Sequence, residues 1–136
     1  MASPAKHIRV VAAVIERDGK YLITQRRSAA VLAGLWEFPG GKVEGNESED
    51  EALRRELRER VGVAVEVKER IAHRTHHYDG YSVDLSLYRT SIAPGEEPKA
   101  LRVADFRWVA SSDFEKYPFP AADQATMDLL LGFKRG

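Results

Sequence analysis

A chain of 136 residues with 21 basic and 21 acidic side chains has no formal net charge, which argues against bulk electrostatic binding to nucleic acid or to an anionic membrane. The length predicts one domain, residues 1–136, and the absence of cysteine excludes disulfides, zinc–thiolate sites and a cysteine nucleophile and fits a cytoplasmic protein. No apolar run approaches the ~20 residues of a membrane span, and the first residues lack the apolar core of a signal peptide.

Two strands and a turn are predicted at the start of the chain. Residues 8–16 are rich in β-branched and apolar side chains and indicate a buried strand. Asp18-Gly19 favours a hairpin turn, so residues 21–25 are expected to return as the partner strand. Arg26 follows directly, and its sequence context alone makes it a solvated strand end.

The segment WEFPGG, residues 36–41, follows a stretch that reads as a loop at residues 28–35. Pro39 restricts Phe38 to extended geometry, and Gly40 and Gly41 are expected to permit a turn that other residues make only at a cost. Glu37 has two interpretations of equal weight. It is either a structural carboxylate that accepts from loop amides or a group that orients a substrate.

A helix is predicted between residues 48 and 62. Ser48 is a good N-cap, Glu51 completes a capping box with it, and Gly62 suits the left-handed position after a helix. An apolar stripe recurs every four residues, at Leu53, Leu57 and Val61.

One face of this helix carries two carboxylates. Glu56, Glu59 and Arg60 are spaced at i, i+3 and i+4, so they share that face. Two carboxylates next to a glycine segment with its backbone carbonyls suit a hard divalent cation such as Mg²⁺.

The rest of the chain reads as strands, a loop and a last helix. Residues 64–75 predict one or two strands, and residues 81–92 alternate as a half-buried strand after a turn at 78–81. A polar loop at 93–104 precedes a short strand at 106–110, and an apolar-sided helix follows residue 123. Tyr81 is either a residue at the edge of the core or a platform on which a base stacks.

A family resemblance is carried by the spacing of Gly41, Glu47, Arg55-Glu56-Leu57, Glu59 and Gly62-Val63. This spacing resembles the signature of the Nudix hydrolases: Gly, five residues, Glu, seven residues, Arg-Glu-aliphatic, one residue, Glu-Glu, one residue, Gly-aliphatic. One position departs from it, because Arg60 stands where the family has the second Glu of the pair. The resemblance implies a mixed α and β fold, an α/β/α sandwich around a mixed curved sheet.

The resemblance also implies a metal site. In the family, the carbonyl at the position of Gly40 and the glutamates at Glu56 and Glu59 bind a divalent cation, Mg²⁺ or alternatively Mn²⁺. Glu56 or Glu59 is expected to double as the base that activates water. Glu47 is expected to brace the loop against the helix through Arg55, with a catalytic role for Glu47 as the alternative.

Further residues resemble the MutT-like branch of the family. There, an arginine at the position of Arg26 faces the nucleotide, and the position of Asp123 hydrogen-bonds the base. A carboxylate only accepts, so Asp123 suits an exocyclic amine such as that of cytosine; the alternative is a cap for the last helix. Relatives place a further metal-binding Glu six residues before the aromatic of the last strand. Counted from Trp108, this position is Arg102.

The activity that the resemblance implies is Mg²⁺-dependent hydrolysis of a nucleoside triphosphate to monophosphate and pyrophosphate, with a cytidine-type or oxidised nucleotide as substrate. Alternatives are a dinucleoside polyphosphate or nucleotide-sugar hydrolase, or a nucleotide-binding relative with weakened hydrolysis. Arg60 leaves three interpretations open: it binds a substrate phosphate, it turns outward and pairs with Glu56, or it marks lost hydrolysis. A monomer or a homodimer is expected, without nucleic acid or membrane partners.

Overall fold

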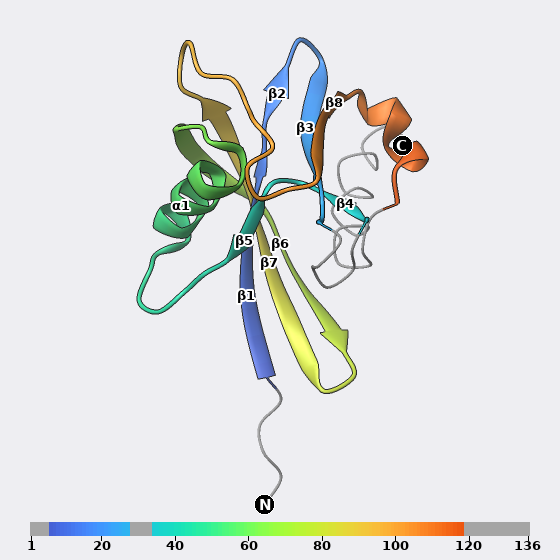
Figure 1. Ribbon diagram of the computed structural model, residues 1–136. Helices are drawn as coiled ribbons and strands as arrows, with labels where there is room; N and C mark the ends of the chain where they lie inside the picture. Colours follow the sequence, from blue (N-terminus) through green and yellow to red (C-terminus); the bar gives the residue numbers. More distant parts are fainter. Residues whose placement is uncertain (1–5, 28–33, 119–136) are drawn as a thin grey trace, which may run out of the picture.

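The computed structural model describes residues 6–27 and 34–118, which form one α-helix, one 3₁₀ helix and two sheets (Figure 1). The first sheet holds, in order, β5 (Gly40–Lys42), β1 (Lys6–Val14), β7 (Tyr81–Ile92) and β6 (Val65–Tyr78). It is mixed, because β1 and β7 run parallel while the other pairs are antiparallel. This confirms the mixed α and β class, while the predicted last helix lies outside the described residues.

The second sheet is centred on β3 (Lys20–Gln25). Strand β3 pairs antiparallel with β2 (Glu16–Arg17), β4 (Trp36–Glu37) and β8 (Asp105–Val109). The predicted turn before it is confirmed, since Asp18 and Gly19 have φ angles of 53° and 77°. A 3₁₀ helix, η1 (Ser111–Lys116), follows β8 and buries Phe114.

From Val11 to Val14, strand β1 is buried on both faces, which explains the continuous apolar run of this half of the strand. Val11 and Ala13 belong to a core cluster that includes the apolar residues of the helix. Ala12 and Val14 belong to a second cluster that joins the two sheets. This half of β1 therefore lies between the two core clusters.

Helix α1 (Glu49–Val61) begins and ends as predicted. Ser48 Oγ accepts from the Glu51 N–H while the Glu51 carboxylate accepts from the Ser48 N–H, so the capping box is formed. Gly62 has a φ of 68°, and its N–H donates to Arg58 O. The predicted stripe of Leu53, Leu57 and Val61 is fully buried.

The loop before β8 covers the end of α1. The N–H groups of Leu101 and Arg102 both donate to Arg60 O, at 3.1 and 3.0 Å, and the Lys99 N–H donates to Val61 O at 2.9 Å. These bonds satisfy carbonyls that a helix end leaves without partners. They also fix the main chain of residues 99–102 beside the last turn of the helix.

Strand β7 has the predicted bounds, but the expectation that one of its faces is open is wrong. Ser82, Ser86 and Thr90 are as buried as the leucines that alternate with them. At Ser86 the reason is that the N-terminal turn of α1 lies over this face, where Ser86 Oγ donates to Glu49 Oε2 at 3.2 Å. Among the residues described, no helix combines the length and the apolar character required to cross a membrane.

Candidate active site

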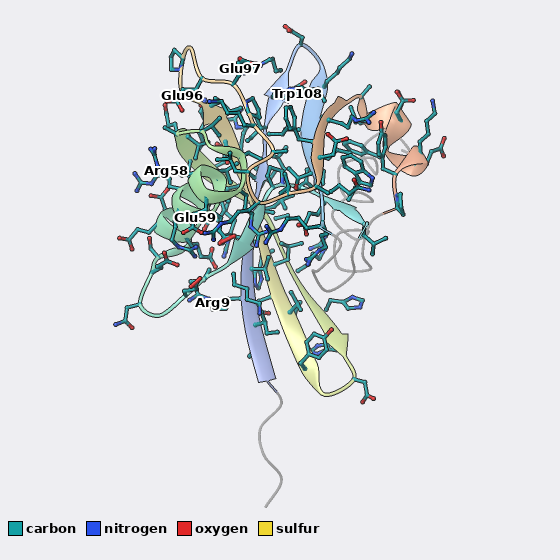
Figure 2. All side chains as sticks on the ribbon, viewed as in Figure 1. Arg9, Arg58, Glu59, Glu96, Glu97 and Trp108 are labelled. Carbon is teal, nitrogen blue, oxygen red and sulfur yellow. The ribbon has the colours of Figure 1, made fainter. Side chains whose placement is uncertain are left out.

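Two cavities lie beside α1 and share Arg26 and Arg60 in their walls. The larger, which we call the polar cavity, has a volume of about 310 Å³. It is lined by four arginines and three glutamates: Arg26, Arg27, Arg60, Arg102, Glu44, Glu56 and Glu59. The smaller, the strand cavity, measures about 100 Å³ and has apolar walls from β1 and β7. Figure 2 shows Glu59 on α1, with Glu96 and Glu97 above it, and Trp108 in the second sheet.

Arg55 joins the carboxylates of the helix to the loop before it. Its Nε and Nη2 donate to the two oxygens of Glu47 at 2.6 and 3.0 Å, and its Nη1 donates to Glu56 at 2.7 Å and to Glu59 at 3.2 Å. The hydrogen bonds from Arg55 and from the Glu44 N–H lower the pKa of Glu47 to about 2. This two-pronged contact has the geometry of the expected brace, and a catalytic role for Glu47 stays a prediction.

Glu56 fills a space that the neighbouring glycine leaves open. Its side chain is only 7% exposed, and a Cβ added to Gly41 would lie 1.7 Å from its Oε2. A Cβ on Gly40 would lie 1.9 Å from Val11 O. Both glycines lie in the extended strand β5 and neither has a positive φ, so the expected turn is wrong. Glycine is needed here because the backbone and Glu56 approach too closely for any side chain.

Arg60 is held against Glu56 and lies in the cleft. Its Nε donates to Glu56 Oε2 at 2.6 Å, which is the i, i+4 pair that the spacing allows. The side chain is 34% exposed and lines both cavities, so it does not turn outward. Arg102 lies nearby, with its Nη1 4.0 Å from Glu59 Oε2. Arg60 and Arg102, the two arginines expected at positions where the family has acids, therefore share one cavity.

Arg26 and Glu37 form a pair on the other side of the cleft. Arg26 Nη2 lies 3.0 Å from Glu37 Oε1, and the Glu37 side chain is 12% exposed. Burial raises the pKa of Glu37, against the lowering effect of Arg26. The Arg26 N–H donates to Leu35 O at 2.9 Å, and the Gly34 N–H donates to Arg26 O at 3.2 Å. These two bonds join Arg26 to residues 34 and 35. We call this pair of bonds the neck, and it fixes the backbone of Arg26 where β3 ends.

Two residues predicted to contact the substrate, Tyr81 and Asp123, are not placed in the cleft by the described part of the chain. Tyr81 begins β7 at the outer turn of the β6–β7 hairpin, away from Leu85, where β7 reaches the strand cavity. Its stacking role stays a prediction. Asp123 lies outside the described residues. Conversely, Val10 and Leu85 line the strand cavity. The signals that could have identified them were the apolar run of β1 and the alternation of apolar residues in β7.

Residues 10–129 match the family described as the NUDIX domain. The chain belongs to the Nudix family. This Nudix hydrolase is 38% identical over 133 residues, 95% of each chain, to a protein of Escherichia coli (strain K12) named CTP pyrophosphohydrolase. It is 36% identical over 122 residues, 85% of this chain and 82% of the relative, to a protein of Mycobacterium tuberculosis (strain H37Rv) named putative 8-oxo-dGTP diphosphatase 2.

The fold is also shared with solved Nudix structures. A crystal structure of a MutT NUDIX hydrolase from Burkholderia pseudomallei superposes with a TM-score of 0.78 and 27% identity, over 90% of this chain and 97% of the other. The resemblance to the MutT-like branch is thereby confirmed in both sequence and fold.

Proposed function

We propose that this Nudix hydrolase cleaves a nucleoside triphosphate into a monophosphate and pyrophosphate with the aid of Mg²⁺, or alternatively Mn²⁺. One observation carries the proposal: Glu56 and Glu59 from α1 and Arg26 from the end of β3 meet in one polar cavity. The name of the 38% identical relative, CTP pyrophosphohydrolase, supports this substrate class. Since nucleoside triphosphates are held in the cytoplasm, we place the activity there.

The donor atoms suit a divalent cation that arrives with its nucleotide. The residues described contain no group of three or more acidic, histidine or cysteine side chains that could hold a metal. Mg²⁺, however, commonly takes one or two carboxylates and completes its shell with substrate phosphates. Glu56, in the space beside Gly41, and Glu59, at 40% exposure, supply those carboxylates, and the Gly40 carbonyl is the third proposed donor. When bound, the cation neutralises phosphate charge and acidifies a water molecule.

The protein side chains then have separate tasks. Glu59 is far more exposed than Glu56, so we assign to Glu59 the orientation of the attacking water and the acceptance of its proton. Arg26 lines both cavities, and we assign to its guanidinium the binding of the substrate phosphates. Glu47 keeps Arg55 in place, and Arg55 in turn positions Glu56 and Glu59. Water adds to phosphorus as the bridging P–O bond breaks, and pyrophosphate leaves.

The base is proposed to be cytosine or an oxidised purine. The two relatives are named for CTP and for 8-oxo-dGTP. The strand cavity offers apolar walls for a ring and one buried carboxylate, Glu37, as an acceptor for an exocyclic amine. Asp123 remains the second proposed acceptor.

The test is a substrate panel on the purified full chain. CTP, dCTP, 8-oxo-dGTP and the ordinary triphosphates are incubated with Mg²⁺ or Mn²⁺, beside diadenosine polyphosphates and nucleotide sugars, and pyrophosphate and mononucleotide are measured. We expect pyrophosphate release from one or a few triphosphates, and at least a hundredfold loss in Glu59→Gln. Turnover confined to the dinucleotides or sugars would assign the site to that other class of substrate.

A second candidate is a nucleotide-binding relative with little hydrolysis. The observation that favours it is the Arg60–Glu56 ion pair, which occupies an oxygen of a proposed metal ligand. Arg60→Glu distinguishes the two functions. A large gain in turnover would reveal an enzyme that has lost a carboxylate, whereas a loss would show that Arg60 serves the reaction.

A further inference from the structure

Guanidinium groups hold both oxygens of one proposed cation ligand. Arg60 Nε donates to Glu56 Oε2 at 2.6 Å, and Arg55 Nη1 donates to Glu56 Oε1 at 2.7 Å. Arg55 also braces Glu47 and Glu59, so it is fixed from several sides. Arg60 is not part of this brace. Its bond to Glu56 is therefore the contact that an incoming ligand can replace.

The two partners of that contact differ in their access to the cleft. The Glu56 side chain is 7% exposed, whereas that of Arg60 is 34% exposed and borders both cavities. The bond to Glu56 uses Nε–H, one of the five N–H donors of a guanidinium. A ligand entering the cleft therefore reaches Arg60 before it reaches Glu56.

Neighbouring arginines make this part of the cleft attractive to anions. Arg26, Arg27 and Arg102 line the same polar cavity, and the Arg102 N–H donates to Arg60 O at 3.0 Å. Phosphate oxygens match the fork of a guanidinium, and a polyphosphate carries more negative charge than one carboxylate. A polyphosphate in the polar cavity therefore competes with Glu56 for Arg60.

We propose that Arg60 exchanges partners when nucleotide binds, leaving Glu56 for a phosphate and so releasing Glu56 Oε2 to the divalent cation. The exchange rests on the proposed function, since it takes the polyphosphate and the cation as its ligands. It makes the binding of nucleotide and of cation mutually favourable, with the nucleotide bound first. Such coupling is reciprocal and commonly amounts to about 5–150-fold in affinity.

Three titrations on the full chain test the exchange. Mn²⁺ alone is followed by the electron paramagnetic resonance of the free ion. A non-hydrolysable methylene-bridged analogue of CTP is titrated in EDTA by calorimetry, and Mn²⁺ is then titrated with the analogue at saturation. The coupling is the factor by which the analogue changes the affinity for Mn²⁺. Mn²⁺ also binds the analogue in solution, but this contribution is the same for variant and wild type and cancels when their couplings are compared.

The variant is Arg60→Gln, and Arg58→Gln is its matched control. Arg58 lies two residues earlier on α1, is exposed, and lines neither cavity; Figure 2 shows it on the outer side of the helix. We expect Arg60→Gln to bind Mn²⁺ alone about tenfold more tightly and the metal-free analogue about tenfold more weakly. Its coupling should be at least fivefold smaller, with Arg58→Gln like the wild type.

Unchanged coupling in Arg60→Gln, or unchanged affinity for the metal-free analogue, would overturn the exchange. Circular dichroism checks folding, and Arg60→Lys replaces Arg60→Gln if the latter unfolds, with smaller shifts in the same directions. Hydrolysis measured in parallel separates the two claims. Coupling without turnover refutes the proposed function and keeps the exchange, whereas turnover without coupling refutes the exchange alone.

Discussion

Adding a single methyl group at Gly41 tests how the site holds Glu56. The Cβ of Gly41→Ala would lie 1.7 Å from Glu56 Oε2 and 2.3 Å from its Cδ, where ordinary contact begins at 3.4 Å. The carboxylate must therefore withdraw by about 1.7 Å. The clash is with the far end of a side chain, which can move. In Gly40→Ala, by contrast, the clash is with backbone, at 1.9 Å from Val11 O and 2.7 Å from Ala12 Cα.

The two substitutions should differ in what they damage. Withdrawal of Glu56 in Gly41→Ala breaks its 2.6 Å bond to Arg60, which costs about 1 kcal/mol because Arg60 is partly exposed. Misplacing a group of the active site, here the proposed cation ligand Glu56, by more than ~1 Å can lower turnover about 100-fold. Gly40→Ala must force β1 and β5 apart, and overpacking of this kind costs about 1–3 kcal/mol or more.

Urea unfolding followed by tryptophan fluorescence gives the stabilities, and pyrophosphate release gives kcat/KM. Gly41→Ala is expected to fold almost normally and lose about two orders of magnitude in kcat/KM, while Gly40→Ala is expected to lose stability first. Full activity in Gly41→Ala, or equal destabilisation by the two variants, would show that Gly41 does not make room for Glu56 and that Gly40 does not make room for the backbone of β1.

Three further predictions concern the support of α1. The pKa of Glu47 is lowered from 4.5 to about 2, so ionised Glu47 stabilises the fold above pH 4.5 and this stabilisation is lost as the pH falls towards 2. In Glu47→Gln, the free energy of unfolding should depend less on pH in this window, and an unchanged pH dependence would contradict the prediction. Tyr88→Phe removes a 2.5 Å bond to Glu49 and should lower the free energy of unfolding by about 1.5 kcal/mol in urea, an effect that an unshifted midpoint would rule out. Ser48→Ala removes the N-cap and should cost about 1 kcal/mol in the same assay without changing kcat, so a fall in kcat would show a wider role.

The helix and its ends could be predicted because the signals are local. A capping box, a left-handed glycine and an apolar stripe each depend on residues within one or two turns, and Ser48, Gly62 and Leu57 behave as expected. The turn at Asp18-Gly19 is local in the same sense. The acidic face of the helix was therefore predictable together with the helix.

What escaped prediction depends on packing between distant segments. Gly41 is required because Glu56, fifteen positions later in sequence, occupies the place of its side chain. Ser86 is buried because Glu49 of α1 lies over it. Arg60 could be predicted to pair with Glu56 from spacing alone, but its position between two cavities follows from the packing of β1 and β5 against the helix. Such contacts leave no trace in periodicity.

The closed neck at Arg26 has a practical use. The backbone bonds of Arg26 to Leu35 and Gly34 connect the chain before residues 28–33 with the chain after them. The position of Arg26 is therefore set by these bonds and does not depend on the number of residues between positions 28 and 33. A protein tolerates an inserted peptide best where the backbone on both sides of the insertion is already held by hydrogen bonds. A fluorescent reporter inserted between residues 28 and 33 is therefore expected to leave Arg26 in place. It would lie a few residues from Arg26 in sequence, close enough to report the proposed binding of nucleotide by that arginine.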